Sequence, residues 1–177
     1  MSRSSASSDP CNRARSREQH AQMSDIQFHG MPGSKRIAYR FTPGTGPALV
    51  FLPGYMSDMA GGKATAVFEW ARARGQACLL LDYSGCGASE GDFADGTLSL
   101  WREEVLALVD ALIEVPVIVI GSSMGGWLML AVGQTLGGQL AGLVGLAPAP
   151  DFTDWGRSDA DKAQLLAGET IYDENPY

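Results

Sequence analysis

The chain has 177 residues, 45% of them hydrophobic, with three cysteines and a net charge of −7. This length suits one domain with its own core, and the acidic balance argues against nucleic acid as a partner because phosphate backbones bind basic surfaces. No apolar run approaches the roughly 20 residues that cross a bilayer, and the cysteines lack zinc-site spacing. We therefore expect no membrane span, no metal and free thiols in a reducing compartment, the cytoplasm.

The first 23 residues are rich in serine and arginine and show no clear apolar face. Such a composition buries too little apolar surface to fold, which predicts a disordered tail over residues 1–23. The other interpretation is that residue 1 comes from an upstream start codon and that Met23 is the true first residue. Residues 24–177 are predicted to form the folded domain.

An antiparallel hairpin is compatible with residues 26–41, turning near Pro32 and Gly33. Short continuous apolar runs predict strands covered on both faces, at residues 48–52, 77–83, 117–120 and 142–147.

Amphipathic patterns between these strands predict three helices, at residues 63–74, 98–112 and 125–136. The second helix is expected to turn its charged side chains to solvent, namely Arg102, Glu103, Glu104 and Asp110. Strands that alternate with helices of this length predict a mostly parallel sheet with helices on both faces. The fold class is therefore α/β.

Residues 121–125, Gly-Ser-Ser-Met-Gly, match the G-x-S-x-G nucleophile elbow, between a buried strand and an apolar helix as that motif requires. A sharp turn would strain the central residue, Ser123, while Gly121 and Gly125 remove side chains that would collide. The Ser123 hydroxyl would then stand at the positive end of a helix, where developing negative charge is stabilised. Ser123 is the candidate nucleophile.

Acyl transfer also needs backbone N–H groups that bind the carbonyl oxygen as it becomes negatively charged. The N–H of Met124 is one candidate, and the N–H of Tyr55 in the stretch Phe-Leu-Pro-Gly-Tyr is the other. A dinucleotide-binding loop is disfavoured, because it requires G-x-G-x-x-G and Ser123 occupies the place of the second glycine. A plain glycine-rich turn without chemistry is the remaining alternative.

Four stretches carry a family resemblance: FLPGYMSDMAGGKA, GQACLLLDYSGCGASEG, TLSLWREEVLALVD and GSSMGGWLML. Over residues 35–150 the chain resembles the α/β-hydrolase superfamily, in particular the mitochondrial palmitoyl-protein thioesterases that also act as acyl-glucuronide esterases, and their bacterial relatives. The resemblance implies a cofactor-free serine hydrolase of class EC 3.1. Its substrates would be small acyl esters or thioesters, or acylated proteins. It also implies the mitochondrial matrix if the source is eukaryotic.

The chain departs from this pattern after the serine. In the superfamily the acid and the histidine of the triad follow the nucleophile, but both histidines, His20 and His29, precede Ser123. Asp151 follows the last predicted strand and is a candidate acid, although the resemblance places that acid one strand later. We expect an incomplete hydrolase fold without the triad acid and histidine, unstable and nearly inactive on its own, with an uncovered strand at residues 142–147.

Residues 148–177 are predicted to begin a lid over the acyl pocket or to form a solvated linker helix. In the lid, four apolar side chains would face the substrate: Phe152, Trp155, Leu165 and Leu166. A non-catalytic hydrolase fold that binds a ligand or partner is the alternative function.

Overall fold

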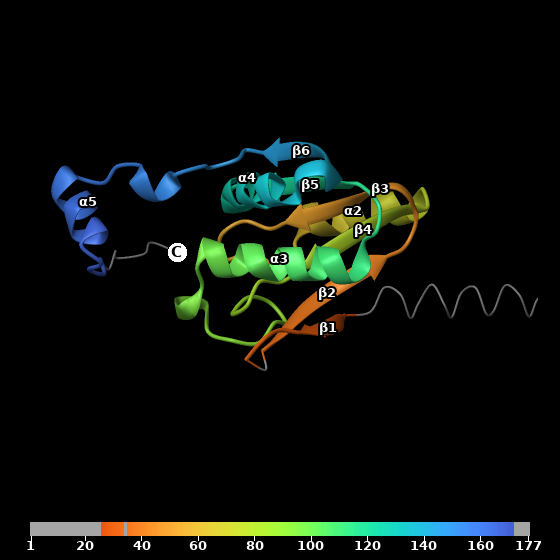
Figure 1. Ribbon diagram of the computed structural model, residues 1–177, viewed down its shortest axis with the longest axis horizontal. Coiled ribbons are helices and arrows are strands. Elements are labelled where there is room, and N and C mark those ends of the chain that lie inside the picture. Colours follow the sequence, from red (N-terminus) through yellow and green to blue (C-terminus); the bar gives the residue numbers. More distant parts are fainter. Residues whose placement is uncertain (1–25, 34, 172–177) are drawn as a thin grey trace, which may run out of the picture.

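Six strands form one sheet in the order β1-β2-β4-β3-β5-β6 (Figure 1). The computed structural model describes residues 26–33 and 35–171, so the predicted tail at residues 1–23 lies outside the described residues. The strands are β1 (Gln27–Gly30), β2 (Arg36–Thr42), β3 (Thr45–Leu52), β4 (Gln76–Leu81), β5 (Val117–Ser122) and β6 (Leu140–Leu146). β1, β2 and β4 pair antiparallel, whereas β4, β3, β5 and β6 run parallel. The predicted mostly parallel sheet is confirmed.

Helices cover both faces of this sheet, as predicted. The long helices are α2 (Gly62–Ala73), α3 (Leu98–Leu112) and α4 (Met124–Leu136). Side chains alternate along each strand, so Val50 faces the core under α3 and α4 while its neighbour Phe51 faces α2. Because both faces are buried, the inner strands are continuous apolar runs.

The helix boundaries follow from local chemistry. The Thr97 hydroxyl accepts a hydrogen bond from the N–H of Leu100 at 3.1 Å and begins α3. Gly75, with a φ of +65°, follows the end of α2, where a left-handed conformation favours glycine. The predicted helices are thus found within one residue of the predicted positions.

Glu104 of α3 contradicts the prediction that it faces solvent. Its side chain is only 2% exposed, and its Oε2 accepts a hydrogen bond from the N–H of Ser84 at 2.9 Å. The segment after β4 contacts α3 here, and helical periodicity alone could not reveal this contact. Burial raises the pKa of Glu104, while hydrogen bonds from Ser84 oppose the shift.

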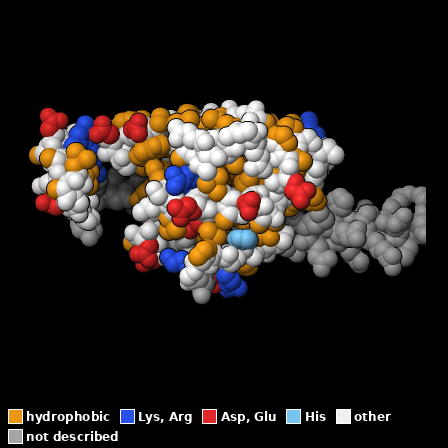
Figure 2. Space-filling view, in the orientation of Figure 1, with side chains coloured by type: hydrophobic (Ala, Val, Ile, Leu, Met, Phe, Trp, Pro, Cys, Tyr) orange, Lys and Arg blue, Asp and Glu red, His pale blue; other side chains and the backbone are white. Residues whose placement is uncertain are grey.

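β6 is less covered than the other parallel strands. It pairs only with β5, and Leu143 and Val144 are 40% and 44% exposed. Its seven residues, Leu-Ala-Gly-Leu-Val-Gly-Leu, carry no charge. Orange hydrophobic side chains and white atoms, rather than red or blue ones, cover most of the upper edge of Figure 2, where β6 lies in Figure 1. The expectation of coverage on both faces was wrong for this strand, which forms an exposed edge of the sheet.

The segment after β6 contains the short helix η3 (Phe152–Asp154) and helix α5 (Asp159–Leu166). A capping box begins α5, since the Ser158 hydroxyl accepts from the N–H of Asp161 and the Asp161 carboxylate accepts from the N–H of Ser158. Figure 1 shows α5 beyond the end of the sheet, away from α3 and α4.

Candidate active site

The turn at Ser123 joins β5 to α4 through a single residue. Ser123 has a φ of 52° and a ψ of −120°, a sparsely populated conformation for any residue but glycine. Its side chain is exposed, whereas Ser122 and Met124 on either side are buried. The hydroxyl of Ser123 is therefore presented to solvent at the N-terminus of α4, where the helix dipole favours negative charge.

The glycines on either side allow this turn to close. An added Cβ on Gly121 would overlap the carbonyl oxygen of Gly125 and lie 2.7 Å from its carbonyl carbon. An added Cβ on Gly125 would overlap the carbonyl oxygen of Leu52 and lie 2.5 Å from that of Pro53. These neighbours are backbone atoms that cannot rotate away, so both positions require glycine for steric reasons.

Hydrogen bonds hold the strained residue in place. The N–H of Ser123 donates to the carbonyl of Leu146 on β6, and the carbonyl of Ser123 accepts from Gly126 and from Ala149. The segment after β6 thus contacts the elbow directly. Strain of about 1–3 kcal/mol persists only where the surroundings fix the backbone in this way.

The loop after β3 lies against the elbow. An added Cβ on Gly54 would lie 3.2 Å from the Cβ of Ser123, so only glycine allows this approach without displacing a neighbour. The carbonyl of Gly54 accepts a hydrogen bond from the N–H of Ser57 at 3.1 Å. Because the N–H of a trans peptide points opposite its carbonyl, the N–H of Tyr55 is directed away from this turn. The N–H of Met124, in the first turn of α4, has no acceptor within the helix.

Asp82 connects this loop to the segment that follows β4. Its carboxylate accepts hydrogen bonds from the N–H groups of Met59 at 2.7 Å and Ala88 at 2.8 Å. Burial raises the pKa of Asp82, and the two N–H donors oppose the shift. An added Cβ on Gly87 would overlap this carboxylate, which requires a glycine there. Sequence reasoning missed Asp82, although an acid directly after the apolar run Leu79–Leu81 was an available signal.

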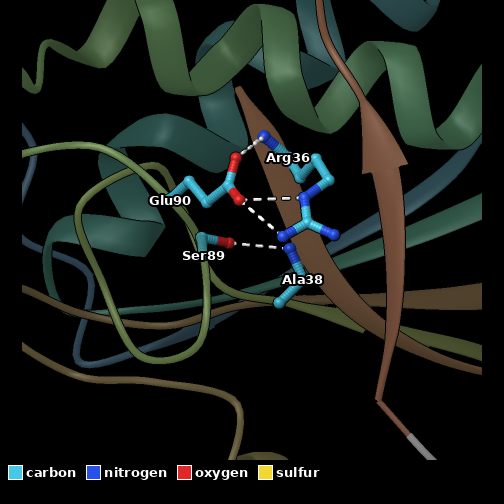
Figure 3. A network of polar contacts seen from close by, with 4 residues as sticks. All are labelled: Arg36, Ala38, Ser89 and Glu90. Atoms are coloured by element: carbon cyan, nitrogen blue, oxygen red, sulfur yellow. Dashed lines mark hydrogen bonds and ion pairs between the residues drawn. The ribbon is translucent and has the colours of Figure 1, made fainter. Parts of the chain in front are cut away.

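The same segment is anchored to β2 (Figure 3). The Ser89 hydroxyl accepts from the N–H of Ala38 at 2.7 Å and donates to the Asp82 carbonyl at 2.7 Å. The Glu90 carboxylate accepts hydrogen bonds from the Arg36 guanidinium at 2.6 and 2.8 Å and from the backbone N–H of Arg36 at 3.0 Å. Beside Arg36 the pKa of Glu90 is lowered, chiefly by the side-chain hydrogen bond. Ser89 and Glu90 thus extend the hydrogen bonding of β2 beyond the end of β4.

A cavity of about 370 Å³ opens beside the loop after β3. Its wall is formed by this loop and by the start of α2, including Gly54, Ser57, Asp58 and Lys63. Tyr55 and Met56 at the tip of the loop are 45% and 64% exposed. Two solvent-exposed apolar side chains therefore follow Gly54, the residue that lies against Ser123.

The remaining candidates are His29 and Asp151. His29 belongs to β1, the opposite edge of the sheet, with three strands between β1 and β5. At about 4.8 Å per strand, His29 is on the order of 19 Å from the elbow strand. Asp151 is exposed, has a φ of 54° and precedes η3. Its role as the triad acid stays a prediction.

The predicted lid residues divide into two groups. Phe152 packs edge-on against Trp127 of α4, with ring centroids 5.8 Å apart. Trp155, Leu165 and Leu166 are exposed. The lid therefore stays a prediction. The contact between Phe152 and Trp127 packs the start of the segment after β6 against α4.

Over residues 26–33 and 35–171, no group of three or more His, Cys, Asp or Glu side chains is placed to hold a metal ion. Cys78 and Cys86 are free thiols, and burial raises the pKa of Cys86 to about 11. No helix within the described part of the chain is long and apolar enough to cross a membrane.

Comparison with known proteins gives matches that include the elbow residues. The model of the alpha/beta hydrolase family matches residues 49–174. The human mitochondrial palmitoyl-protein thioesterase ABHD10 is 40% identical over 130 residues, which are 73% of this chain and 42% of that protein. The chain thus spans about two fifths of the length of this curated relative.

Solved structures agree with the sequence matches. Mouse alpha/beta hydrolase domain-containing protein 10 superposes with a TM-score of 0.74 at 35% identity, covering 84% of this chain and 61% of the other. A putative hydrolase from Agrobacterium vitis S4 gives a TM-score of 0.70 at 34% identity, covering 86% of this chain and 67% of the other. With the elbow and the sheet order, these matches show that the chain belongs to the α/β-hydrolase family.

Proposed function

We propose that the protein is a serine esterase or thioesterase that forms an acyl-enzyme on Ser123. The observation that carries this proposal is the exposed hydroxyl of Ser123 on a strained turn, held by backbone hydrogen bonds at the start of α4. A structural turn has no need of such strain, whereas a nucleophile at the positive end of a helix gains from it.

In the proposed reaction the Ser123 oxygen attacks the carbonyl carbon of the acyl group, and the carbonyl oxygen becomes an oxyanion. The N–H groups of Met124 and Tyr55 are proposed to bind that oxyanion. The bond to the leaving sulfur or oxygen then breaks, and the leaving group takes up a proton as a thiol or an alcohol. In the second half water attacks the acyl carbon, the ester bond to Ser123 breaks, the acyl group leaves as a carboxylic acid, and the serine oxygen regains a proton from the attacking water.

Activation of Ser123 requires a base that takes its proton. None of the described residues provides an imidazole near the elbow, since His29 lies on the opposite edge of the sheet. The proposed turnover therefore requires a base from outside the described residues. The same observation favours the second candidate function, a non-catalytic hydrolase fold that binds an acyl ligand.

The substrate is proposed to be an acyl ester or thioester, free or on an acylated protein, because the relatives are named palmitoyl-protein thioesterases. The exposed Tyr55 and Met56 beside the elbow support an apolar substrate group. A mitochondrial location is likewise proposed from the names of these relatives. Cytoplasmic location stays an expectation.

The test measures hydrolysis of an acyl thioester and of the matching p-nitrophenyl ester by the full-length protein. Ser123→Ala is expected to abolish both activities, because the residual rate without a nucleophile lies far below turnover. Ser122→Ala, a neighbouring serine whose side chain is buried, is the matched control and is expected to keep both. An inactive wild type that still binds a non-hydrolysable acyl analogue supports the binding function instead.

A further inference from the structure

Tyr83, two residues after β4, lies beneath the loop after β3 that carries the proposed oxyanion donor Tyr55. Its side chain is fully buried, and its hydroxyl donates a hydrogen bond to the carbonyl of Pro53 at 3.1 Å. Pro53 directly follows β3 and precedes Gly54, so this carbonyl lies two residues before the N–H of Tyr55. The hydroxyl thus satisfies a buried carbonyl at the point where the loop begins.

The Tyr83 ring is itself fixed by Trp101 of α3. The two rings stack with centroids 5.1 Å apart, and the indole N–H of Trp101 donates to the carbonyl of Ser84 at 3.3 Å. Phe93 contacts Trp101 with centroids 5.8 Å apart, and Tyr55 contacts Phe93 at 5.3 Å. Successive contacts therefore connect Pro53, Tyr83, Trp101, Phe93 and Tyr55, so both ends of the segment 53–55 are packed against the same aromatic cluster.

Both peptide groups that flank Gly54 are held through their carbonyl oxygens. Tyr83 holds the peptide between Pro53 and Gly54, and the N–H of Ser57 holds the peptide between Gly54 and Tyr55. Glycine is the most flexible residue, so without these two bonds the Tyr55 N–H could turn about Gly54. The Pro53 carbonyl also lies against Gly125, where an added Cβ would come within 2.5 Å of it.

We propose that Tyr83 is a positioning residue, which aims the Tyr55 N–H at the carbonyl oxygen of an acyl group on Ser123 through its hydrogen bond to Pro53. This inference rests on the proposed function. Burial raises the pKa of Tyr83 well above its ordinary value, which favours the protonated hydroxyl that donates to Pro53. A phenylalanine at this position would keep the ring and its stacking but leave the carbonyl without its donor.

The experiment compares Tyr83→Phe with Tyr39→Phe in the full-length protein. Tyr39 is also a buried tyrosine, and its hydroxyl donates to Gln27 at 3.2 Å on the hairpin, away from the loop. Both variants thus lose one hydroxyl hydrogen bond of a buried tyrosine ring, that of Tyr83 to a buried carbonyl and that of Tyr39 to an exposed glutamine. We expect Tyr83→Phe to lower kcat by about 10- to 100-fold with KM changed less than about twofold, and Tyr39→Phe to leave both unchanged.

A second readout separates positioning from general loosening of the core. A trifluoromethyl ketone forms a hemiketal oxyanion on the serine and imitates the transition state, whereas an uncleavable ether analogue imitates only the substrate. Tyr83→Phe is expected to weaken the ketone by the same factor as kcat/KM and to leave the ether unchanged. Equal weakening of both ligands, or an unchanged kcat, overturns the role of Tyr83 while the serine hydrolase stands. A wild type that lacks activity and Ser123 acylation overturns the proposed function itself.

Discussion

The steric closure of the elbow leads to a prediction about Gly125→Ala. The added Cβ would lie 2.5 Å from the Pro53 carbonyl oxygen, while real Cβ atoms essentially never come closer than 3.0 Å. The end of β3 and the start of α4 must therefore separate by 3.0 − 2.5 = 0.5 Å or more at this contact, and further at the Leu52 carbonyl. Overpacking of this kind costs about 1–3 kcal/mol, and the higher helix propensity of alanine returns up to about 1 kcal/mol.

For Gly125→Ala we expect the free energy of unfolding to fall by about 2 kcal/mol, which lowers Tm by about 4–8 °C in a domain of this size. Thermal unfolding followed by circular dichroism measures the shift. The matched control is Gly62→Ala at the start of α2, where an added Cβ meets no atom within 4 Å, so Tm is expected to stay or rise. A Gly125→Ala variant as stable as Gly62→Ala refutes the claim that position 125 requires glycine for steric reasons.

Two further predictions concern the body of the fold. The pKa of Glu104 is raised above its ordinary 4.5 in the folded protein, so stability falls as the pH rises through the raised value. Glu104→Gln keeps an acceptor for Ser84. Urea unfolding should show the wild type losing stability relative to this variant as the pH rises above the ordinary value of 4.5; parallel curves contradict the assignment. Val144→Lys places a charge on the exposed edge strand and should reduce light scattering by the 177-residue chain, whereas unchanged scattering means that β6 does not drive association.

The type and order of the elements could be predicted because they rest on local patterns. Apolar runs such as Val117–Ile120 mark strands buried on both faces, and the G-x-S-x-G spacing around Ser123 carries its own steric requirement. Gly121 and Gly125 show that requirement directly, since each lies where a side chain would overlap backbone. These signals need no knowledge of distant partners.

The contacts between loops could not be predicted in this way. Glu104 looked like a solvent-facing helix residue, and only the position of Ser84, 20 residues away, explains its burial. Asp82 and Tyr83 act on Met59 and Pro53, 23 and 30 residues away, through single hydrogen bonds that leave no periodicity. The exposure of β6 likewise depends on what lies beside it, not on its own composition.

Covalent labelling of Ser123 tests the central claim most directly. The full-length protein is treated with a fluorophosphonate, and the modified peptide is identified by mass spectrometry. We predict one adduct on the Ser123 hydroxyl that is lost in Ser123→Ala and kept in Ser122→Ala, because the elbow exposes Ser123 and buries Ser122. An unlabelled protein, or an adduct that persists in Ser123→Ala, contradicts the account.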